Sequence, residues 1–245
     1  VGSTPELDNL AAKGARFENC TVPCPLCVPS RVAFFNGQYP SVTGCRDNTR
    51  LTPAEGSRHL PGLLTKNGYR CGLFGKNHCF SDPYVAGFET FHDEGKVKRE
   101  LRERYGRPFP EPPLTIDKEV LNTKTRRFKW GSYPDPIWSG GEFPFSSEES
   151  PSRLNVDAAL EFIEACDGDS FFSWISFMDA HPAYRAPTDF LDLYDPQKMI
   201  LPDRLENELD TKPFVQQVYY HGGWLDLMDE SQLRQTMAYY YAQVS

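Results

Sequence analysis

The clearest pattern of hydrophobic and polar positions lies in the second half of the chain. Val156, Ala159, Leu160 and Ile163 recur at helical spacing, with polar residues between them. The apolar run 171–177 follows soon afterwards and has the length of a buried strand. These positions predict a helix that leads into a strand.

The same order of a helix and then a strand is predicted twice more. Residues 60–66 predict a helix, and residues 69–74 predict a short buried strand. Near the start of the chain, residues 5–14 predict a helix and residues 15–22 predict a strand. A last helix is expected over residues 230–244.

Repeated helix-then-strand units predict an α/β fold in which a mostly parallel sheet is sandwiched by helices. In such sheets, ligands bind beyond the carboxyl ends of the strands. Residues 95–153 break the pattern with a basic stretch, a proline-rich turn and two adjacent glycines. We interpret them as an insertion rather than a separate domain. The basic stretch is either a solvated helix face or a contact for an anionic polymer.

Composition narrows the class of function. The net charge of −8 over 245 residues argues against a general nucleic-acid binder, whose affinity depends on an excess of Lys and Arg. No apolar run approaches the ~20 residues that span a bilayer. The seven cysteines are odd in number and leave the redox compartment open.

Candidate chemistry starts at residues 27–31, Cys-Val-Pro-Ser-Arg. Pro29 suits the first position of a helix, which we expect over residues 29–36. The free N–H groups of its first turn and the positive end of its dipole would point toward Cys27. Arg31 adds a permanent positive charge. The pattern predicts an anion site at Cys27, although a buried free cysteine before a helix would look the same.

Two further polar segments follow predicted strands. In residues 75–78, Lys76 and His78 are two positions apart and can reach one pocket if the loop is extended. His181 follows the strand predicted over 171–177, and an imidazole can transfer a proton near neutral pH. Each residue is also compatible with an ordinary surface or loop position. The remaining histidines are interpreted as structural or surface residues: His59, His92 and His221.

The Cys-X-Pro-X-Arg run resembles the maturation motif of the type I sulfatases, members of the alkaline-phosphatase-like superfamily. In that family the cysteine is oxidised to formylglycine. Further segments resemble family landmarks in the family's order: residues 4–11, 37–40, 68–70, 75–78 and 181–187, with a weaker match at 239–245. On this resemblance, residues 1–245 are the N-terminal part of a sulfatase catalytic domain, with the insertion at about 95–153.

The resemblance implies a role for each candidate. Cys27, converted to formylglycine by a formylglycine-generating or anaerobic sulfatase-maturing enzyme, is the nucleophile, and Arg31 is its neighbour in the site. Lys76 bridges the sulfate and the formylglycine, and His78 hydrogen-bonds the formylglycine hydroxyl. His181 contacts the sulfate and protonates the leaving alcohol. The implied substrate is a sulfated small molecule or glycan, and many family members are exported to the periplasm or beyond the cell.

A calcium ion is also implied, with Cys27, as formylglycine, among its ligands. Calcium takes about 6–8 oxygen ligands, largely carboxylates. The two acidic pairs that supply these carboxylates in the family, and the lysine that follows the second pair, are not found in residues 1–245. We therefore expect an internal part of a longer domain, which binds calcium poorly and shows little or no turnover by itself.

Three alternatives stay open from the sequence. A phosphonate or phosphate ester hydrolase of the same superfamily can carry the same motif. A radical S-adenosylmethionine enzyme would use Cys20, Cys24 and Cys27 for an iron–sulfur cluster and residues 140–142 for its cofactor, although these lie more than a hundred residues from the cysteines. A sulfatase-like binding module would leave Cys27 unmodified.

Overall fold

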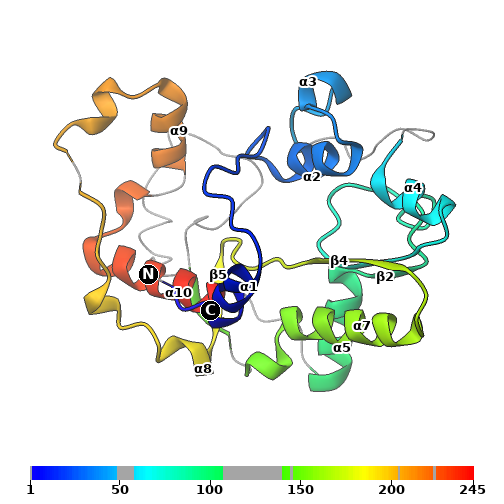
Figure 1. Cartoon of the computed structure of the whole chain (residues 1–245). Helices are drawn as coiled ribbons and strands as arrows, with labels where there is room; N and C mark the ends of the chain where they lie inside the picture. The colour runs from blue at the N-terminus through cyan, green and yellow to red at the C-terminus, as the bar shows by residue number, and fades with distance from the viewer. Residues whose placement is uncertain (1, 49–57, 107–139, 144–145, 204, 223–224) are drawn as a thin grey trace. The chain divides into compact units, whose positions relative to one another are not determined.

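The protein is described by a computed structural model, in which the chain divides into two compact units. The three-stranded unit comprises Ala11–Phe109 and Pro151–Met178, and the two-stranded unit comprises Val1–Leu10, Pro110–Ser150 and Asp179–Ser245 (Figure 1). The structure describes residues 2–48, 58–106, 140–143, 146–203, 205–222 and 225–245.

The three-stranded unit is an α/β structure. Its sheet has the order β2-β1-β4, and both pairs of neighbouring strands are parallel, as predicted. In chain order its elements are α2 (Cys27–Asn36), α3 (Pro40–Thr43), α4 (Leu60–Lys66), β1 (Arg70–Gly75), β2 (Thr90–His92), α5 (Glu94–Tyr105), α7 (Pro151–Ala165) and β4 (Phe171–Ser176).

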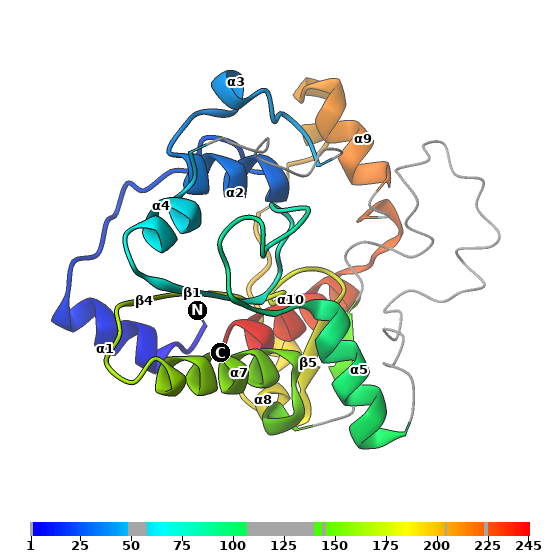
Figure 2. The same ribbon diagram turned by 90° about the vertical axis from the view of Figure 1, so that its right-hand side faces the viewer.

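Helices cover both faces of this sheet because side chains alternate along the central strand β1. Cys71 and Leu73 belong to one buried cluster together with residues of α2 and α4. Phe74 belongs to a second cluster with Ala159 and Phe162 of α7. Figures 1 and 2 show α2 and α4 on one side of the strands and α7 on the other. Each fully buried large side chain contributes roughly 1.5–3 kcal/mol to folding.

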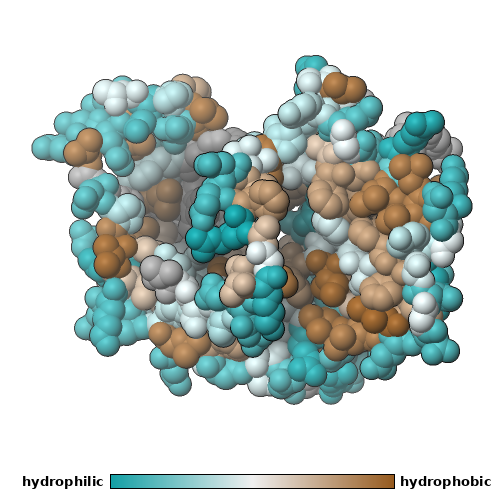
Figure 3. All heavy atoms as spheres, in the orientation of Figure 1, coloured by the Kyte–Doolittle hydropathy of each residue, from teal (hydrophilic) through white to brown (hydrophobic). Residues whose placement is uncertain are grey.

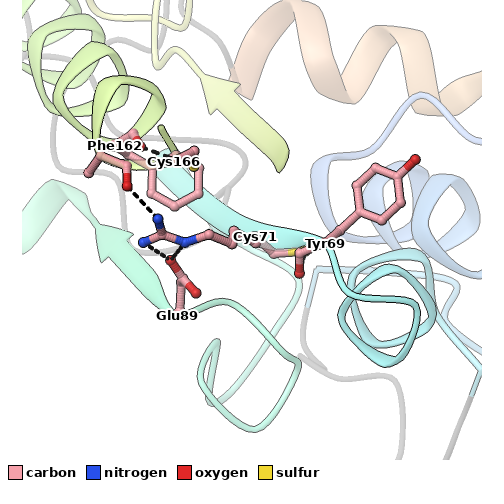
Figure 4. Close-up of polar contacts among 7 residues, drawn as sticks. Tyr69, Cys71, Glu89, Phe162 and Cys166 are labelled. Atoms are coloured by element: carbon pink, nitrogen blue, oxygen red, sulfur yellow. Dashed lines mark hydrogen bonds and ion pairs between the residues drawn. The ribbon is translucent and has the colours of Figure 1, made fainter. Parts of the chain in front are cut away.

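Arg70, the first residue of β1, is hydrogen-bonded to two neighbouring segments, and its partner Glu89 is labelled in Figure 4. Its Nε donates a 2.8 Å hydrogen bond to Oε1 of Glu89, and its Nη1 donates to the carbonyl oxygen of Ala165 at 2.5 Å. Glu89 precedes β2 and Ala165 ends α7. The start of the central strand is thereby held between a neighbouring strand and a helix.

Apolar side chains remain partly exposed along β4. Among the residues that the structure describes, β4 pairs with β1 alone. Phe171, Ile175 and Phe177 are 42%, 38% and 44% exposed. Figure 3 shows apolar side chains gathered over this strand and the helices beside it.

The two-stranded unit is built around α10 (Glu230–Val244). This helix packs against β3 (Gly140–Phe143) and β5 (Tyr184–Pro187), which pair in parallel. Asp229 begins α10 with a capping box that includes Gln232. The other helices that the structure describes in this unit are η1 (Ser147–Glu149), α8 (Thr188–Leu191), η2 (Pro196–Lys198), η3 (Glu208–Thr211), α9 (Phe214–Gly222) and η4 (Leu225–Leu227), and α1 (Pro5–Lys13) begins here.

Most predicted elements are confirmed. The helices over 60–66 and 230–244 have the predicted bounds, and the strands over 69–74 and 171–177 are each found within one residue. The strand over 15–22 is wrong, because these residues form a connection in which Phe17 and Val22 are exposed.

The buried face of α7 also differs from the predicted hydrophobic positions. The helix buries Leu154, Asn155, Ala159 and Phe162, whereas Leu160 is exposed. Both sets of positions have helical spacing, so periodicity alone does not distinguish them.

The predicted insertion at 95–153 lies partly outside the described residues. Its first part is α5, which Asp93 caps by accepting from the N–H of Lys96 at 2.8 Å.

Of the helices that the structure describes, none has both the length and the apolar character that a membrane crossing requires.

Candidate active site

Cys27 is the first residue of α2. The N–H of Ser30 already bonds to the carbonyl oxygen of Leu26 at 3.0 Å, so the helix begins two residues before the predicted start at Pro29. The N–H of Val28 donates to Oδ1 of Asn48 at 3.0 Å. The first turn of a helix has free N–H groups and the positive end of the dipole. Cys27 therefore lies at the electropositive end of α2, as the sequence predicted.

Lys76 comes to Cys27 from the carboxyl end of β1. Its Nζ lies 3.7 Å from Sγ of Cys27 and donates to it, although 49 residues separate the two in the sequence. Lys76 is only 5% exposed. A buried ammonium group needs compensation, and a thiolate, an oxyanion or a bound anion at this position would provide it.

Gly75 determines how Lys76 leaves the strand. Its φ is +95°, and a Cβ atom at this position would lie 2.1 Å from the carbonyl oxygen of Ser176. That oxygen accepts a 2.8 Å hydrogen bond from the N–H of Lys76. Only glycine fits this approach of β1 to β4.

Arg31 lies one turn along α2 from Cys27 and is joined to both strand ends. Its Nη1 donates to Oγ of Ser176 at 2.7 Å and to the carbonyl oxygen of Lys76 at 3.3 Å. With the bond between the N–H of Lys76 and Ser176, these contacts form a closed ring of three residues. Burial lowers the pKa of Arg31, an effect that Cys27 and Cys79 oppose.

Ser176 is the residue of this ring that sequence reasoning missed. It is buried and ends β4, where it lies opposite Gly75 in the register of the sheet. The available signal was a polar residue at the carboxyl end of an apolar strand, the edge at which ligands bind.

His78 lies in the same loop as Lys76. It is exposed and has a φ of +44°, in the left-handed region that a non-glycine residue rarely adopts. Asn77 shapes the loop: its Oδ1 accepts from the N–H of Cys79 and the N–H of Phe80 at 3.2 and 2.9 Å. The loop therefore has a defined shape around Lys76 and His78.

His181 belongs to the two-stranded unit, so its approach to Cys27 stays a prediction. It is partly buried, and its Nδ1 donates to the carbonyl oxygen of Pro182 at 2.5 Å. Asp179, two residues before His181, accepts a 2.8 Å hydrogen bond from Gln243 of α10. The Nε2 atom of His181 is thus the ring nitrogen available for proton transfer.

The other histidines have structural partners. Nδ1 of His59 caps α4 by accepting from the N–H of Gly62 at 3.2 Å. His221 contacts Asp226 at 3.2 Å. His92 is buried between Asn155 and Glu100.

The described side chains do not fit a calcium ion. Within the described ranges, no three His, Cys, Asp or Glu residues lie close enough to hold a metal ion. The side chain that bonds to Cys27 is the cationic Lys76, and Arg31 adds a second positive charge nearby, whereas calcium requires oxygen ligands. The same finding counts against an iron–sulfur cluster on Cys20, Cys24 and Cys27, which are free thiols.

Comparisons with known proteins show the family of the chain. The family model described as Sulfatase matches residues 1–244. A sulfatase from Formosa agariphila is 30% identical over 222 residues, which are 86% of this chain and 41% of that protein. A Delta 4,5-hexuronate-2-O-sulfatase from Bacteroides thetaiotaomicron is 31% identical over 124 residues, covering 48% of this chain and 23% of that protein.

A solved structure shares the fold. The phosphonate monoester hydrolase SpPMH from Silicibacter pomeroyi superposes with a TM-score of 0.73 at 19% identity, over 99% of this chain and 51% of that one. This likeness confirms the predicted α/β fold. The chain spans about half the length of the relatives that it matches most fully.

Proposed function

Because this chain belongs to the sulfatase family, we propose that the complete protein hydrolyses sulfate monoesters with a nucleophile made from Cys27. The observation that carries the proposal is the 3.7 Å contact between Nζ of Lys76 and Sγ of Cys27 at the start of α2. It joins a nucleophile position and a buried cation, although the two residues are far apart in the sequence.

The charges around Cys27 suit a tetrahedral anion. A sulfate monoester carries one negative charge over its free oxygens, and more charge develops on the leaving oxygen as the S–O bond breaks. Lys76, Arg31 and the first turn of α2 are positive or partly positive groups. They are held in place before the substrate binds, which is how a site stabilises charge that develops in the transition state.

The proposed nucleophile is formylglycine, produced from Cys27 by a maturation enzyme. The hydrated aldehyde has two hydroxyl groups on one carbon. One loses its proton as its oxygen attacks sulfur and displaces the alcohol, which takes up a proton from an acid that we assign to His181. The other hydroxyl then loses its proton, the aldehyde re-forms and sulfate leaves. We assign His78 to the hydrogen bond that assists this second step.

The resemblance to the family implies a calcium ion, whose carboxylate ligands would come from residues other than the described ones. The part played by this chain is to hold the nucleophile and the anion-binding cations.

We extend the proposal to sulfated glycans as the substrate class. A relative that is 31% identical over part of this chain is named for a sulfated hexuronate. A pyranose ring with its hydroxyl groups would reach the site as the alcohol part of the ester.

A phosphonate or phosphate monoester hydrolase is the second candidate. The two cations beside one nucleophile, Lys76 and Arg31, are as compatible with it as with a sulfatase. Two positive charges can accommodate a monoanion or a dianion, so they do not distinguish sulfur from phosphorus.

The test uses the complete protein co-expressed with a formylglycine-generating enzyme. Release of an aryl alcohol is measured from an aryl sulfate and from an aryl phosphonate, and the peptide that contains Cys27 is weighed by mass spectrometry. We expect the mass of formylglycine at position 27 and faster turnover of the sulfate than of the phosphonate. Turnover should be lost in Cys27→Ala and kept in the matched variant Cys24→Ala. Faster turnover of the phosphonate would favour the second candidate. An intact thiol without turnover would indicate a binding module.

A further inference from the structure

Buried polar side chains gather around the turn that carries Lys76. Of the five buried polar or charged residues among those described, Thr236 belongs to the two-stranded unit, and four belong to the three-stranded unit: Lys76, His92, Asn155 and Ser176. The ring described above contains Lys76 and Ser176. His92 and Asn155 lie behind the same turn and have no part in the proposed chemistry.

Asn155 projects from α7 toward Gly75. A Cβ atom at Gly75 would lie 3.2 Å from Nδ2 of Asn155, on the side of the turn that faces the helix. The carbonyl oxygen of Ser176 limits the same turn from β4. The backbone oxygen of Ser176 and the side-chain amide of Asn155 therefore both lie on the side of Gly75 where a Cβ atom would be, and they leave room there for glycine alone.

His92 fixes the orientation of Asn155. It lies opposite Phe74 in the register of β2 and β1, and its Nδ1 donates to Oδ1 of Asn155 at 3.0 Å. Its Nε2 lies 2.9 Å from Oε1 of Glu100 in α5. The amide cannot rotate without losing the first bond, and the imidazole cannot rotate without losing both.

The hydrogen bonds among Asn155, His92 and Glu100 are not needed for the stability of the core. Replacing a buried hydrogen-bonded pair by apolar groups of similar shape is often close to neutral for stability. An arrangement of three partners from α7, β2 and α5 instead fixes one geometry. Of the three partners, Asn155 lies nearest the candidate active site, because it approaches Gly75, the residue before Lys76.

We propose that Asn155 and His92 are positioning residues that hold the Gly75–Lys76 turn in the geometry that places Nζ of Lys76 beside Cys27. This inference rests on the proposed function for the role of Lys76, but not for the structural coupling. Asn155 acts on Lys76 through the turn, and His92 acts through Asn155.

The test is a double-mutant cycle in the complete protein. Asn155→Leu keeps the side-chain volume and removes the amide. We expect a loss of about 10-fold in kcat/KM for an aryl sulfate, with little further loss when the same change is made in Lys76→Ala. Equal losses in the two backgrounds would overturn the proposal.

Hydrogen exchange gives a readout that does not need turnover. The N–H of Lys76 donates to the carbonyl oxygen of Ser176, so a loosened turn should exchange that amide faster. We expect faster exchange in peptides that contain residues 75–78 in Asn155→Leu. Unchanged exchange there would overturn the proposal, whereas a wild-type protein that turns over no sulfate ester would refute the proposed function alone.

Two further variants separate positioning from folding. His92→Leu combined with Asn155→Leu removes both partners, so neither is left buried and unpaired, and the same loosening of the turn is expected. His59→Asn is the matched control, because His59 is a structural histidine of the same unit and asparagine can also cap α4. It should show neither coupling to Lys76 nor faster exchange at 75–78.

Discussion

Oγ of Ser176 accepts a 2.7 Å hydrogen bond from Nη1 of Arg31, which joins the end of β4 to the helix that begins at Cys27. Ser176→Ala removes the acceptor and leaves a partly buried cation with one bond fewer. We expect the free energy of unfolding to fall by about 1–3 kcal/mol, measured by urea denaturation of the complete protein.

Ser173 provides the matched control on the same strand. Its Oγ is buried and has no hydrogen-bond partner among the described residues. Ser173→Ala should therefore leave stability unchanged or raise it slightly. Equal effects of the two substitutions would contradict a specific role for the bond to Arg31.

Gly75→Ala should disturb the same region through the backbone. The added methyl group would lie 2.1 Å from the carbonyl oxygen of Ser176, and the φ of +95° is unfavourable for alanine. We expect a loss of more than about 2 kcal/mol in stability and a large loss of activity. Gly106→Ala is the control, because Gly106 also has a positive φ but has nothing within 4 Å of the added group. A similar cost at both positions would refute the steric argument.

Arg31→Lys tests whether the planar guanidinium group matters as well as its charge. Lysine keeps the charge, but its ammonium group is a compact charge on a flexible chain, whereas the planar guanidinium group holds Nη1 at one position from which it bonds to both Ser176 and Lys76. We expect kcat/KM for an aryl sulfate to fall about 10²-fold. Lys66→Ala, at the exposed end of α4, should have little effect. Full activity of Arg31→Lys would show that charge alone suffices.

Cys79 should make stability fall at alkaline pH. Burial raises the pKa of its thiol from 9.0 to about 12, and Arg31 only partly opposes this. Between these values the unfolded state has lost the proton and the folded state keeps it. The stabilisation is therefore complete below pH 9.0 and is lost as the pH rises toward about 12.

The slope is measured by denaturation at several pH values in this window. Each pH unit should cost at most about 1.4 kcal/mol through this one group. Cys79→Ala should have a shallower slope than wild type, although it is less stable overall. Cys20→Ala, at an exposed cysteine, should keep the wild-type slope. An unchanged slope in Cys79→Ala would contradict the assignment.

Local sequence patterns predicted the elements better than their pairing. The helix predicted over 29–36 followed from Pro29, and it begins two residues earlier in the structure, whereas the helix over 230–244 followed from the spacing of its apolar residues. β2 has three residues, too few for a pattern, and it forms only because β1 offers its edge. The strand over 15–22 had the right composition, but the described structure gives it no neighbouring strand.

The sequence predicted some residues of the candidate site and missed others. Cys27, Arg31 and Lys76 were found from short motifs, and the structure brings them together. Ser176 and Asn155 were missed because each acts through contacts that depend on sheet register and on the rotation of α7. Such contacts between distant residues leave no periodic trace in one sequence.

The open side of β4 has a practical consequence for anyone who purifies residues 1–245 by themselves. Among the described residues this strand pairs on one side only, and Phe171, Ile175 and Phe177 are partly exposed along it. An apolar strand with a free edge is a template for the same strand of another molecule. Such a preparation will tend to self-associate and aggregate, and a lysine in place of Ile175 is the kind of gatekeeper that keeps it in solution.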